Sequence, residues 1–341
     1  MKTSIKPLDG FALLQTRHCV TGSMRQVYAF HGCNVNEDLL LGLGEGLGFM
    51  YWHTKGQLPF LGGRSAPKPG MEVVAGQRTG VTVVEHRTGS ARKARQSLLN
   101  LLAAGQPAMI QVDMGYLPYF DFGGDAFHFG GHVIVVCGVD PLAEQVLIAE
   151  GDILHPVPFA DLERARGSIC PFAPKNRWWT FDFSSFRPPS AEETRLAIFN
   201  QAQAMLHPPI KNFGVSGIRT TAERIPRWPA QMSAEEIRGA LFSAYIFVSA
   251  EGGTGGGIFR AMFGRFLMEA AALTGEARLS ESATAFQHIA EDWDSFAAWA
   301  REVSESPNPA DRLNECAAPL QAIAAQEQAA WENLFQLNNQ N

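Results

Sequence analysis

The chain has 341 residues, of which 46% are hydrophobic and 18% are charged. This composition is typical of a chain that buries a sizeable core, and it excludes wholesale disorder. The 28 Lys and Arg residues against 34 Asp and Glu residues give a net charge of −6, which argues against a nucleic-acid binder that works by neutralising phosphates. At roughly 150 residues per domain, the length predicts about two domains.

The sequence also bears on location and on the use of cysteine. No apolar run approaches the roughly 18–20 residues of a membrane span, and Asp9 stands where a signal peptide would need its apolar stretch. We therefore expect a cytoplasmic protein with no membrane partner. The five cysteines are odd in number and follow no spacing typical of a metal site or a disulfide framework. In a reducing compartment, we expect any functional cysteine to be a nucleophile.

The first part of the chain, residues 1–187, alternates short apolar runs with Gly and Pro turns, which predicts an α+β domain. The last two strands predicted there flank a turn-rich segment at 140–144 and are expected to form a hairpin. The predicted helices cover 20–31, 37–41 and 90–104, and the predicted strands cover 108–113, 132–139 and 145–149.

Beyond residue 187 the pattern becomes helical. The Pro188–Pro189 pair marks the boundary, and the segments Ser190–Glu193 and Ser233–Glu236 predict capping boxes that open helices. We expect residues 188–341 to form an all-α domain whose apolar stripes are core. The predicted helices cover approximately 190–206, 215–224, 233–250, 257–274, 280–304 and 310–336.

Cys19 is the first candidate for chemistry. It directly precedes the helix predicted at 20–31, and a helix N-terminus stabilises negative charge through its dipole and its unpaired N–H groups. A cysteine in that position has a lowered pKa and more of the thiolate that attacks carbonyl carbons. A buried cysteine with a structural role would fit the same position.

A cysteine nucleophile needs a base, and His132 opens the strand predicted at 132–139. The two glycines before it, Gly130 and Gly131, leave room for a substrate backbone or for another loop to approach. The apolar strand behind His132 would hold the imidazole ring in place. The alternative is a histidine at a strand edge without a catalytic role.

The predicted hairpin places an acid near His132. If its turn is centred near residue 141, the antiparallel partner of His132 is about residue 150, or about 152 with a longer loop. Glu150 and Asp152 stand there, and their equal parity puts both on one face, where an acid would orient the imidazole. Either could instead be a solvated charge at a strand end. A cysteine that opens a helix, followed by a histidine and an acid on neighbouring strands, is the arrangement of the papain-like fold.

The sequence offers a metal site as an alternative. Asp121, Asp125, His128 and His132 lie within twelve residues of one another, and the two histidines have HxxxH spacing. The glycines between them indicate a loop rather than the helix that would align such a pair. We therefore expect no metal.

Longer stretches of the sequence resemble a known family. The segment 17–51, the segment Tyr116–Tyr119 and the segment 130–140 resemble the N-terminal domain of butirosin biosynthesis protein H. The second part of the chain is similar to the helical domain that commonly accompanies it, through residues 206–209, 214–219 and 252–271.

The resemblance implies a papain-like acyltransferase. The namesake of the family moves an aminoacyl group from an acyl carrier protein thioester to an amine of an aminoglycoside. Carried over to this chain, it implies Cys19 as nucleophile, His132 as base and Glu150 as the acid, with Asp152 as the alternative acid.

The same resemblance implies the partners. These are an acyl carrier protein, whose phosphopantetheine arm is substrate rather than bound cofactor, and a small-molecule amine acceptor in specialised-metabolite biosynthesis such as that of antibiotics. A hydrolase of the peptidase, amidase or thioesterase type would use the same residues, and a non-catalytic carrier-binding module would keep them as a relic. The oligomeric state is left open, a homodimer included.

Further residues are expected near the substrate. Papain-like enzymes often place a glutamine six residues before the cysteine to serve the oxyanion hole, but Leu13 stands there and Gln15 lies four residues before Cys19 instead. The backbone N–H of Cys19 can still contribute one donor. Asp113, Tyr116 and Tyr119 are expected to line the cleft, although the two tyrosines could equally belong to a packed aromatic loop.

The helical part contains one candidate anion site. The glycine-rich turn 252–257 precedes a predicted helix that carries Arg260 in its first turn, and a helix N-terminus with an arginine can hold a phosphate. We expect this turn to face the cleft of Cys19 and His132 and to bind the donor arm. A tight connection between packed helices is the alternative.

Overall fold

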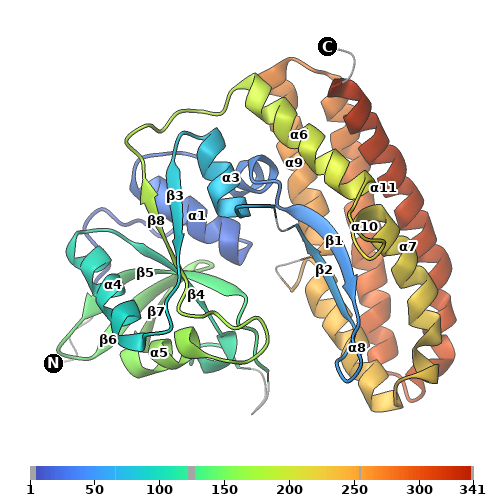
Figure 1. Cartoon of the computed structure of the whole chain (residues 1–341), viewed down its shortest axis with the longest axis horizontal. Helices are drawn as coiled ribbons and strands as arrows, with labels where there is room; N and C mark the ends of the chain where they lie inside the picture. The colour runs from blue at the N-terminus through green and yellow to red at the C-terminus, as the bar shows by residue number, and fades with distance from the viewer. Residues whose placement is uncertain (1–4, 66, 122–126, 253–254, 339–341) are drawn as a thin grey trace. The chain divides into compact units, whose positions relative to one another are not determined.

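The computed structural model describes residues 5–65, 67–121, 127–252 and 255–338 (Figure 1). Backbone contacts divide the chain into two compact units. The first unit contains residues 1–40 and 79–188, and the second contains residues 41–78 and 189–341. The first is a mixture of helices and strands and the second is mainly helical, so the predicted α+β class with a helical C-terminal region is confirmed at that level.

A six-stranded sheet forms the centre of the first unit, in the order β3-β8-β4-β5-β6-β7 with every neighbour antiparallel. The predicted hairpin is present as β5 and β6, with a bulge between Val136 and Gly138 that shifts the register. The strands are β3 (Thr82–His86), β4 (Ala108–Val112), β5 (His132–Asp140), β6 (Gln145–Glu150), β7 (Ile153–Pro158) and β8 (Trp178–Asp182).

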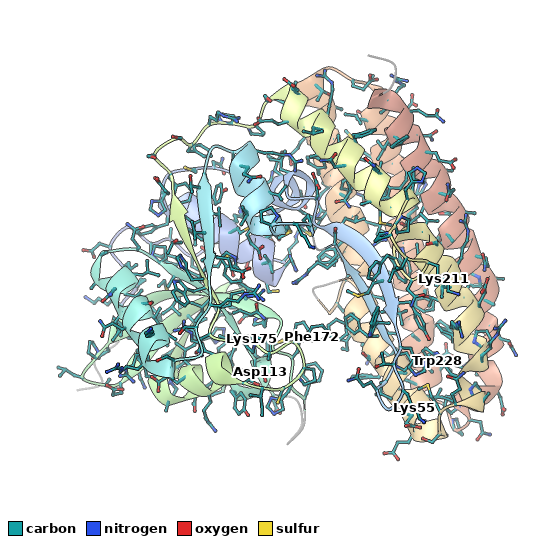
Figure 2. The ribbon with its side chains drawn as sticks, viewed as in Figure 1. Lys55, Asp113, Phe172, Lys175, Lys211 and Trp228 are labelled. Carbon is teal, nitrogen blue, oxygen red and sulfur yellow. The ribbon has the colours of Figure 1, made fainter. Side chains whose placement is uncertain are left out.

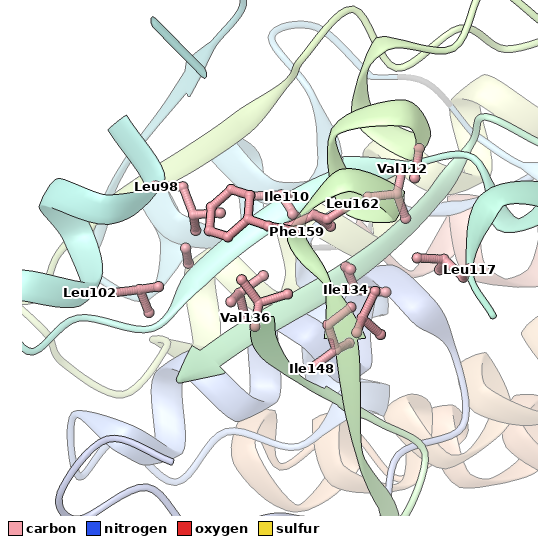
Figure 3. Close-up of a cluster of buried hydrophobic side chains, with 14 residues drawn as sticks. Leu98, Leu102, Ile110, Val112, Leu117, Ile134, Val136, Ile148, Phe159 and Leu162 are labelled. Carbon is pink, nitrogen blue, oxygen red and sulfur yellow. The ribbon is translucent and has the colours of Figure 1, made fainter. Parts of the chain in front are cut away.

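Helices pack on this sheet through an apolar core. Ile110, Ile134 and Ile148 from the strands meet Leu98 and Phe159 from the helices (Figure 3). A further helix, α1, packs along β5 and β4. The helices of this unit are α1 (Cys19–Phe30), α4 (Ala91–Ala103) and α5 (Phe159–Gly167), together with the 3-10 helix η1 (Met114–Tyr116). A further helix, α2 (Glu37–Leu43), begins in the first unit and ends in the second.

The second unit combines a two-stranded hairpin with long helices. The hairpin strands β1 (Leu47–Trp52) and β2 (Phe60–Arg64) pair antiparallel, and they pack against α7 and α8, respectively (Figure 1). The remaining elements are α3 (Met71–Arg78), α6 (Ala191–Leu206), α7 (Gly214–Arg224), η2 (Ile225–Ala230), α8 (Ala234–Val248), α9 (Gly256–Thr274), α10 (Arg278–Glu305), η3 (Pro309–Cys316) and α11 (Ala317–Asn338). Among the described residues, no helix is both long and apolar enough to cross a membrane.

Local capping explains where two of these helices begin. Ser190 caps α6 and Ser233 caps α8, each accepting a hydrogen bond from the backbone N–H of the glutamate three residues on, whose carboxylate returns a contact to the cap. Both capping boxes were predicted from sequence, and both are confirmed.

The structure differs from the predicted domain division in one segment. Residues 41–78 were expected in the first domain, but they pack with the helices of the second unit. The backbone N–H of Tyr51 donates to the carbonyl of Asn212 at 2.9 Å, and Gly42 lies so close to the Phe266 ring that a Cβ there would clash. Such contacts join segments that are far apart along the chain, so the local pattern of residues 41–78 did not indicate them.

Candidate active site

Cys19 is the first residue of α1, as its position before a helical pattern suggested. His18 is the N-cap residue, and its ring accepts a hydrogen bond from the backbone N–H of Thr21 at 3.4 Å. The turn before Cys19 is held by Glu37, whose carboxylate accepts from the backbone N–H groups of Arg17 at 2.9 Å and His18 at 3.0 Å. Glu37 thus satisfies the N–H of the N-cap residue, one of the donors that the start of a helix leaves unpaired, and it also holds the residue before the cap.

Glu37 is a residue that sequence analysis missed. Its side chain is buried, and it also accepts from the hydroxyl of Thr21 at 3.0 Å. The only local signal was an acidic residue at the start of a predicted helix, and a surface acid would give the same signal. Its contact with the turn before Cys19 is tertiary, which explains why it was not found.

His132 opens β5 and Glu150 closes β6. The register pairs Val135 with Ala149, so Glu150 lies diagonally across from His132 on the neighbouring strand. Both side chains project from the same face of the sheet, as the predicted hairpin implied. Glu150 Oε1 lies 2.5 Å from His132 Nε2. The oxygen lies off the direction of the ring N–H, so the contact is an ion pair rather than a straight hydrogen bond.

The surroundings of His132 favour its protonated form. Burial of the ring acts to lower the pKa, but the Glu150 carboxylate and a hydrogen bond with the Cys19 side chain outweigh it and raise the pKa of His132 from 6.5 to about 10. A protonated imidazole beside a thiol is the arrangement that stabilises a thiolate. The three side chains can therefore act together as nucleophile, proton carrier and orienting acid.

Two aromatic residues hold the acid and the base. The hydroxyl of Tyr119 donates to Glu150 Oε2 at 2.6 Å, and burial followed by the Glu150 charge raises the pKa of Tyr119. Phe120 meets the His132 ring edge to face, with centroids 5.6 Å apart. The Tyr119 ring is itself stacked on His155 at 3.9 Å. Tyr119 was expected to line the cleft, and it is instead the residue that fixes the Glu150 carboxylate.

Two hydrogen bonds tie the Cys19 helix to the strands of the sheet. One turn after Cys19, the Ser23 hydroxyl donates to the carbonyl of Val133 at 3.2 Å. Before Cys19, the backbone N–H of Thr16 donates to the carbonyl of Gly151 at 3.1 Å. These bonds fasten α1 beside the residues that follow His132 and Glu150, and so they set the distance between the cysteine and the pair on the strands.

Two family profiles match the chain. The profile described as butirosin biosynthesis protein H, N-terminal, matches residues 18–151, and a domain of unknown function, DUF4872, matches residues 160–334. The chain belongs to the butirosin biosynthesis protein H family. The first matched range contains Cys19, His132 and Glu150. No curated protein matches the chain.

In this member of the butirosin biosynthesis protein H family, only one of the two candidate acids reaches the histidine. Glu150 contacts His132, whereas Asp152 is exposed in the turn between β6 and β7. Among the described residues, Asp152 has no hydrogen-bond or ion-pair partner. The bulge in β5 places Asp152 opposite His132 in register, but there the strand pairing has already ended.

Gln15 lies at the edge of a cavity beside the nucleophile turn. The cavity has a volume of about 310 Å³, and Gln15 is exposed. Its backbone carbonyl accepts from Arg25 at 3.0 Å, while its side chain is left to face solvent. The lining residues carry both signs of charge and comprise Gln15, Arg17, Arg25, Asn36, Glu37 and Asp38.

Asp113 does not line a cleft, contrary to expectation. Its side chain is 0% exposed, and its carboxylate is saturated by four donors: the backbone N–H groups of Gly115 at 3.0 Å and Phe129 at 3.1 Å, His128 Nδ1 at 3.0 Å and the Ser168 hydroxyl at 2.5 Å. Asp113, labelled in Figure 2, therefore joins the turn after β4 to Phe129 and Ser168.

Tyr116 belongs to the same packed loop. Its ring lies 4.9 Å from that of His128 and 5.5 Å from the Arg164 guanidinium. The alternative given for it, a packed aromatic residue, describes its surroundings better than a cleft-lining position.

The potential metal ligands that lie close together in the structure are not the four residues that the sequence offered. Asp113, His128 and Cys170 place their ligand atoms within 4.8 Å of one another, but the Asp113 carboxylate already has its four donors. His132, a member of the predicted set, is engaged by Cys19 and Glu150. Asp125, another member, lies outside the described residues.

The glycines before His132 accommodate another loop rather than a substrate. A Cβ at Gly130 would lie 2.7 Å from the carbonyl oxygen of Phe172, and the side-chain amide of Gln111 donates to the Gly130 carbonyl at 2.5 Å. The loop of Phe172 therefore occupies the space beside Gly130, and the Phe129 ring, which would lie 2.6 Å from a Cβ at Gly131, occupies the space beside Gly131.

Arg260 is not placed to bind a substrate, which corrects the expectation for the helical part. Its side chain is 0% exposed. It donates to both oxygens of Glu327, at 2.8 and 3.1 Å, and to the carbonyl of Gly48 at 3.0 Å. The indole N–H groups of Trp293 and Trp331 also donate hydrogen bonds to the Glu327 carboxylate, at 2.8 and 3.1 Å.

The glycine turn that precedes Arg260 is packed as well. A Cβ at Gly256 would lie 2.9 Å from the Trp293 ring, and one at Gly63 would lie 2.6 Å from Gly255. The alternative of a tight connection between helices therefore accounts for the described part of the turn. Two of its residues, Gly253 and Thr254, lie outside the described residues.

Proposed function

We propose that the protein is a papain-like, cysteine-dependent acyltransferase that takes an acyl or aminoacyl group from an acyl carrier protein thioester and transfers it to a small-molecule amine. The observation that carries the proposal is the contact of His132 with both Cys19 and Glu150. Membership of the butirosin biosynthesis protein H family supports a setting in antibiotic biosynthesis, which we place in the cytoplasm.

The first half-reaction forms an acyl-enzyme. Because Glu150 contacts Nε2 of His132, the other ring nitrogen, Nδ1, is left to face the Cys19 sulfur. The thiolate attacks the thioester carbonyl carbon, and the backbone N–H of Cys19 stabilises the resulting oxyanion. The carbon–sulfur bond to the phosphopantetheine arm breaks, and the imidazolium of His132 gives its proton to the departing thiolate.

The second half-reaction returns the enzyme to its starting state. The amine attacks the acyl-Cys19 carbonyl, and neutral His132 takes the proton that the amine nitrogen loses. The bond to the Cys19 sulfur then breaks, which releases the amide and restores the thiolate beside the imidazolium. Glu150, held by Tyr119, keeps the ring oriented and stabilises its charge through both steps.

The cavity beside the nucleophile turn is the proposed entry for the acceptor. Its lining combines Arg17 and Arg25 with Glu37 and Asp38, which suits a polar acceptor that carries amines and hydroxyls. Gln15, exposed at its edge, would contact such a molecule rather than complete the oxyanion hole.

Product analysis tests the proposal. The purified protein is incubated with an acyl-pantetheine thioester and an amine, and the amide and the free acid are quantified for wild type and for Cys19→Ala. We expect amide as the main product of the wild type and neither product from Cys19→Ala. Free acid as the sole product at every amine concentration would instead identify a hydrolase. Equal turnover of both proteins would exclude Cys19 as the nucleophile, and no product from either would leave a non-catalytic carrier-binding module.

A further inference from the structure

The helical unit contains a second polar cavity, away from the residues of the proposed acyl transfer. It has a volume of about 190 Å³, which is below the roughly 300–1,000 Å³ of pockets for drug-sized ligands. It therefore suits a small group or the end of a longer ligand. Tyr51, His53, Asn212, Thr220, Arg224, Arg227, Trp228 and Gln231 line the cavity.

The lining of this cavity is cationic. Arg224 ends α7 and Arg227 lies in η2, and no Asp or Glu is among the lining residues. Within the part of the chain that the structure describes, neither arginine forms an ion pair. In the view of Figure 2, Trp228 lies between Lys211 and Lys55. Arg224 and Arg227 thus bring two positive charges to one cavity in a chain whose net charge is −6.

A buried hydroxyl adds an uncharged donor. Trp228 Nε1 donates to the hydroxyl oxygen of Tyr51 at 3.1 Å, and Tyr51 is 3% exposed. No described residue accepts the proton of this hydroxyl, so it is left to point at the cavity. Burial raises the pKa of Tyr51, and the nearby Arg224 charge acts in the opposite direction, which places the guanidinium close to the phenol.

A helix dipole accounts for only part of this arrangement. Arginines near the C-terminus of α7 are favourable on electrostatic grounds alone, because positive charge there is stabilised by the helix dipole. A purely structural role would explain the arginines and nothing more. The dipole does not explain why a buried tyrosine hydroxyl lacks an acceptor beside them. It also does not explain why a polar cavity separates the arginines from the end of β1.

We propose that this cavity is a binding site for a phosphate group, either free or as the monoester end of a small molecule. Arg224 and Arg227 would supply charge and paired N–H donors, a geometry that matches phosphate oxygens. The Tyr51 hydroxyl would donate to a third oxygen, with its own oxygen held by Trp228. The site is built entirely within the helical unit, and it does not depend on the acyltransferase proposal.

Calorimetric titration tests the site. The full-length protein is titrated with inorganic phosphate, phenyl phosphate and acetate at constant ionic strength, as wild type and as Arg224→Gln, Arg227→Gln, Tyr51→Phe and Arg219→Gln. Arg219 is an exposed arginine on the same helix, outside the cavity lining, and is the matched control. The unfolding temperature of each variant without ligand shows whether it is folded.

We expect saturable binding of one phosphate per chain. The loss of one charge-assisted contact should weaken it about tenfold in Arg224→Gln and in Arg227→Gln, and Tyr51→Phe should weaken it by a smaller factor. Arg219→Gln should bind as the wild type does. Tighter binding of phenyl phosphate than of phosphate would identify a monoester as the ligand, and equal or weaker binding would identify the free anion. Binding of acetate as tight as that of phosphate, equal losses in Arg219→Gln and the cavity variants, or no saturable binding by the wild type would overturn the proposal.

Discussion

The hydroxyl of Tyr119 donates to one oxygen of Glu150 at 2.6 Å while the other oxygen of the same carboxylate lies 2.5 Å from His132. The acid is thus clamped between a phenol and an imidazole, and it has little freedom to rotate. A carboxylate fixed in this way can hold the ring in one orientation throughout a reaction cycle. Tyr119 is therefore a positioning residue that acts through Glu150.

The first prediction concerns this clamp. Tyr119→Phe removes a hydrogen bond to a charged acceptor, which is worth roughly 1.5–3 kcal/mol, and part of this loss should appear as a kcat reduced about tenfold with little change in KM. Tyr116→Phe, which removes a hydroxyl from the neighbouring loop, is the control and should stay within about twofold of wild type. Steady-state kinetics with a thioester donor provide the comparison, and equal losses in the two variants would remove the positioning role of Tyr119.

The second prediction separates the two acids. Glu150→Gln leaves His132 without its charge partner, and kcat should fall by about two or more orders of magnitude. Asp152→Asn changes an exposed residue of the β6–β7 turn and should leave kcat nearly unchanged. The kinetics of both variants decide the matter: a larger loss in Asp152→Asn would transfer the orienting role to Asp152, and small losses in both would reduce the triad to a Cys–His pair.

Local sequence patterns were sufficient for the elements that carry Cys19, His132 and Glu150. The helix start and the hairpin were predictable because both depend on residues close together in sequence, and the parity of Glu150 follows from the two-residue period of a strand. The contact of Glu150 with His132 depends on the bulge in β5, which the sequence pattern did not indicate.

Other features depended on contacts between distant segments. Glu37 acts on the site across a tertiary contact, so nothing beside it in sequence marks it. Tyr119 was expected near the substrate, but its contact with Glu150 was not predicted. β7 was missed because Pro156 and Pro158 argue against a strand, but it is an edge strand, where proline is tolerated. Arg260 looked like an anion ligand at a helix start because its partner, Glu327, lies on another helix.

The third prediction follows from the protonation of His132. Its pKa is about 10 in the folded protein, compared with 6.5 for the free group, so the native state binds this proton more tightly than the unfolded state does. The associated stability is fully present below about pH 6.5 and is lost as the pH rises through about 10. The free energy of unfolding should therefore fall over that range.

Urea unfolding at a series of pH values measures this dependence. His132→Gln keeps every other titrating group, so its curve should be flatter than that of the wild type between about pH 6.5 and 10. Parallel curves for the two proteins would show that His132 does not gain its proton affinity on folding.

The fourth prediction concerns the buried pair of the helical unit. Arg260→Met leaves the Glu327 carboxylate buried without its cation, which should cost about 3–5 kcal/mol of unfolding free energy. Arg219→Met, which changes an exposed arginine of α7 in the same unit, is the control and should cost less than about 1 kcal/mol. Tryptophan fluorescence follows the unfolding because Trp293 and Trp331 both bond to Glu327. Equal costs in the two variants would contradict a structural role for Arg260.

The most direct test of the acyltransferase account is to trap the acyl-enzyme. The protein is mixed with an acyl-pantetheine thioester in the absence of amine, quenched in acid and analysed by intact mass and by peptide mapping. We predict a mass increase of one acyl group, located on Cys19 among the five cysteines, which disappears when an amine is added and does not form in Cys19→Ala. An acyl group on another residue, or none while amide is still produced, would contradict the account.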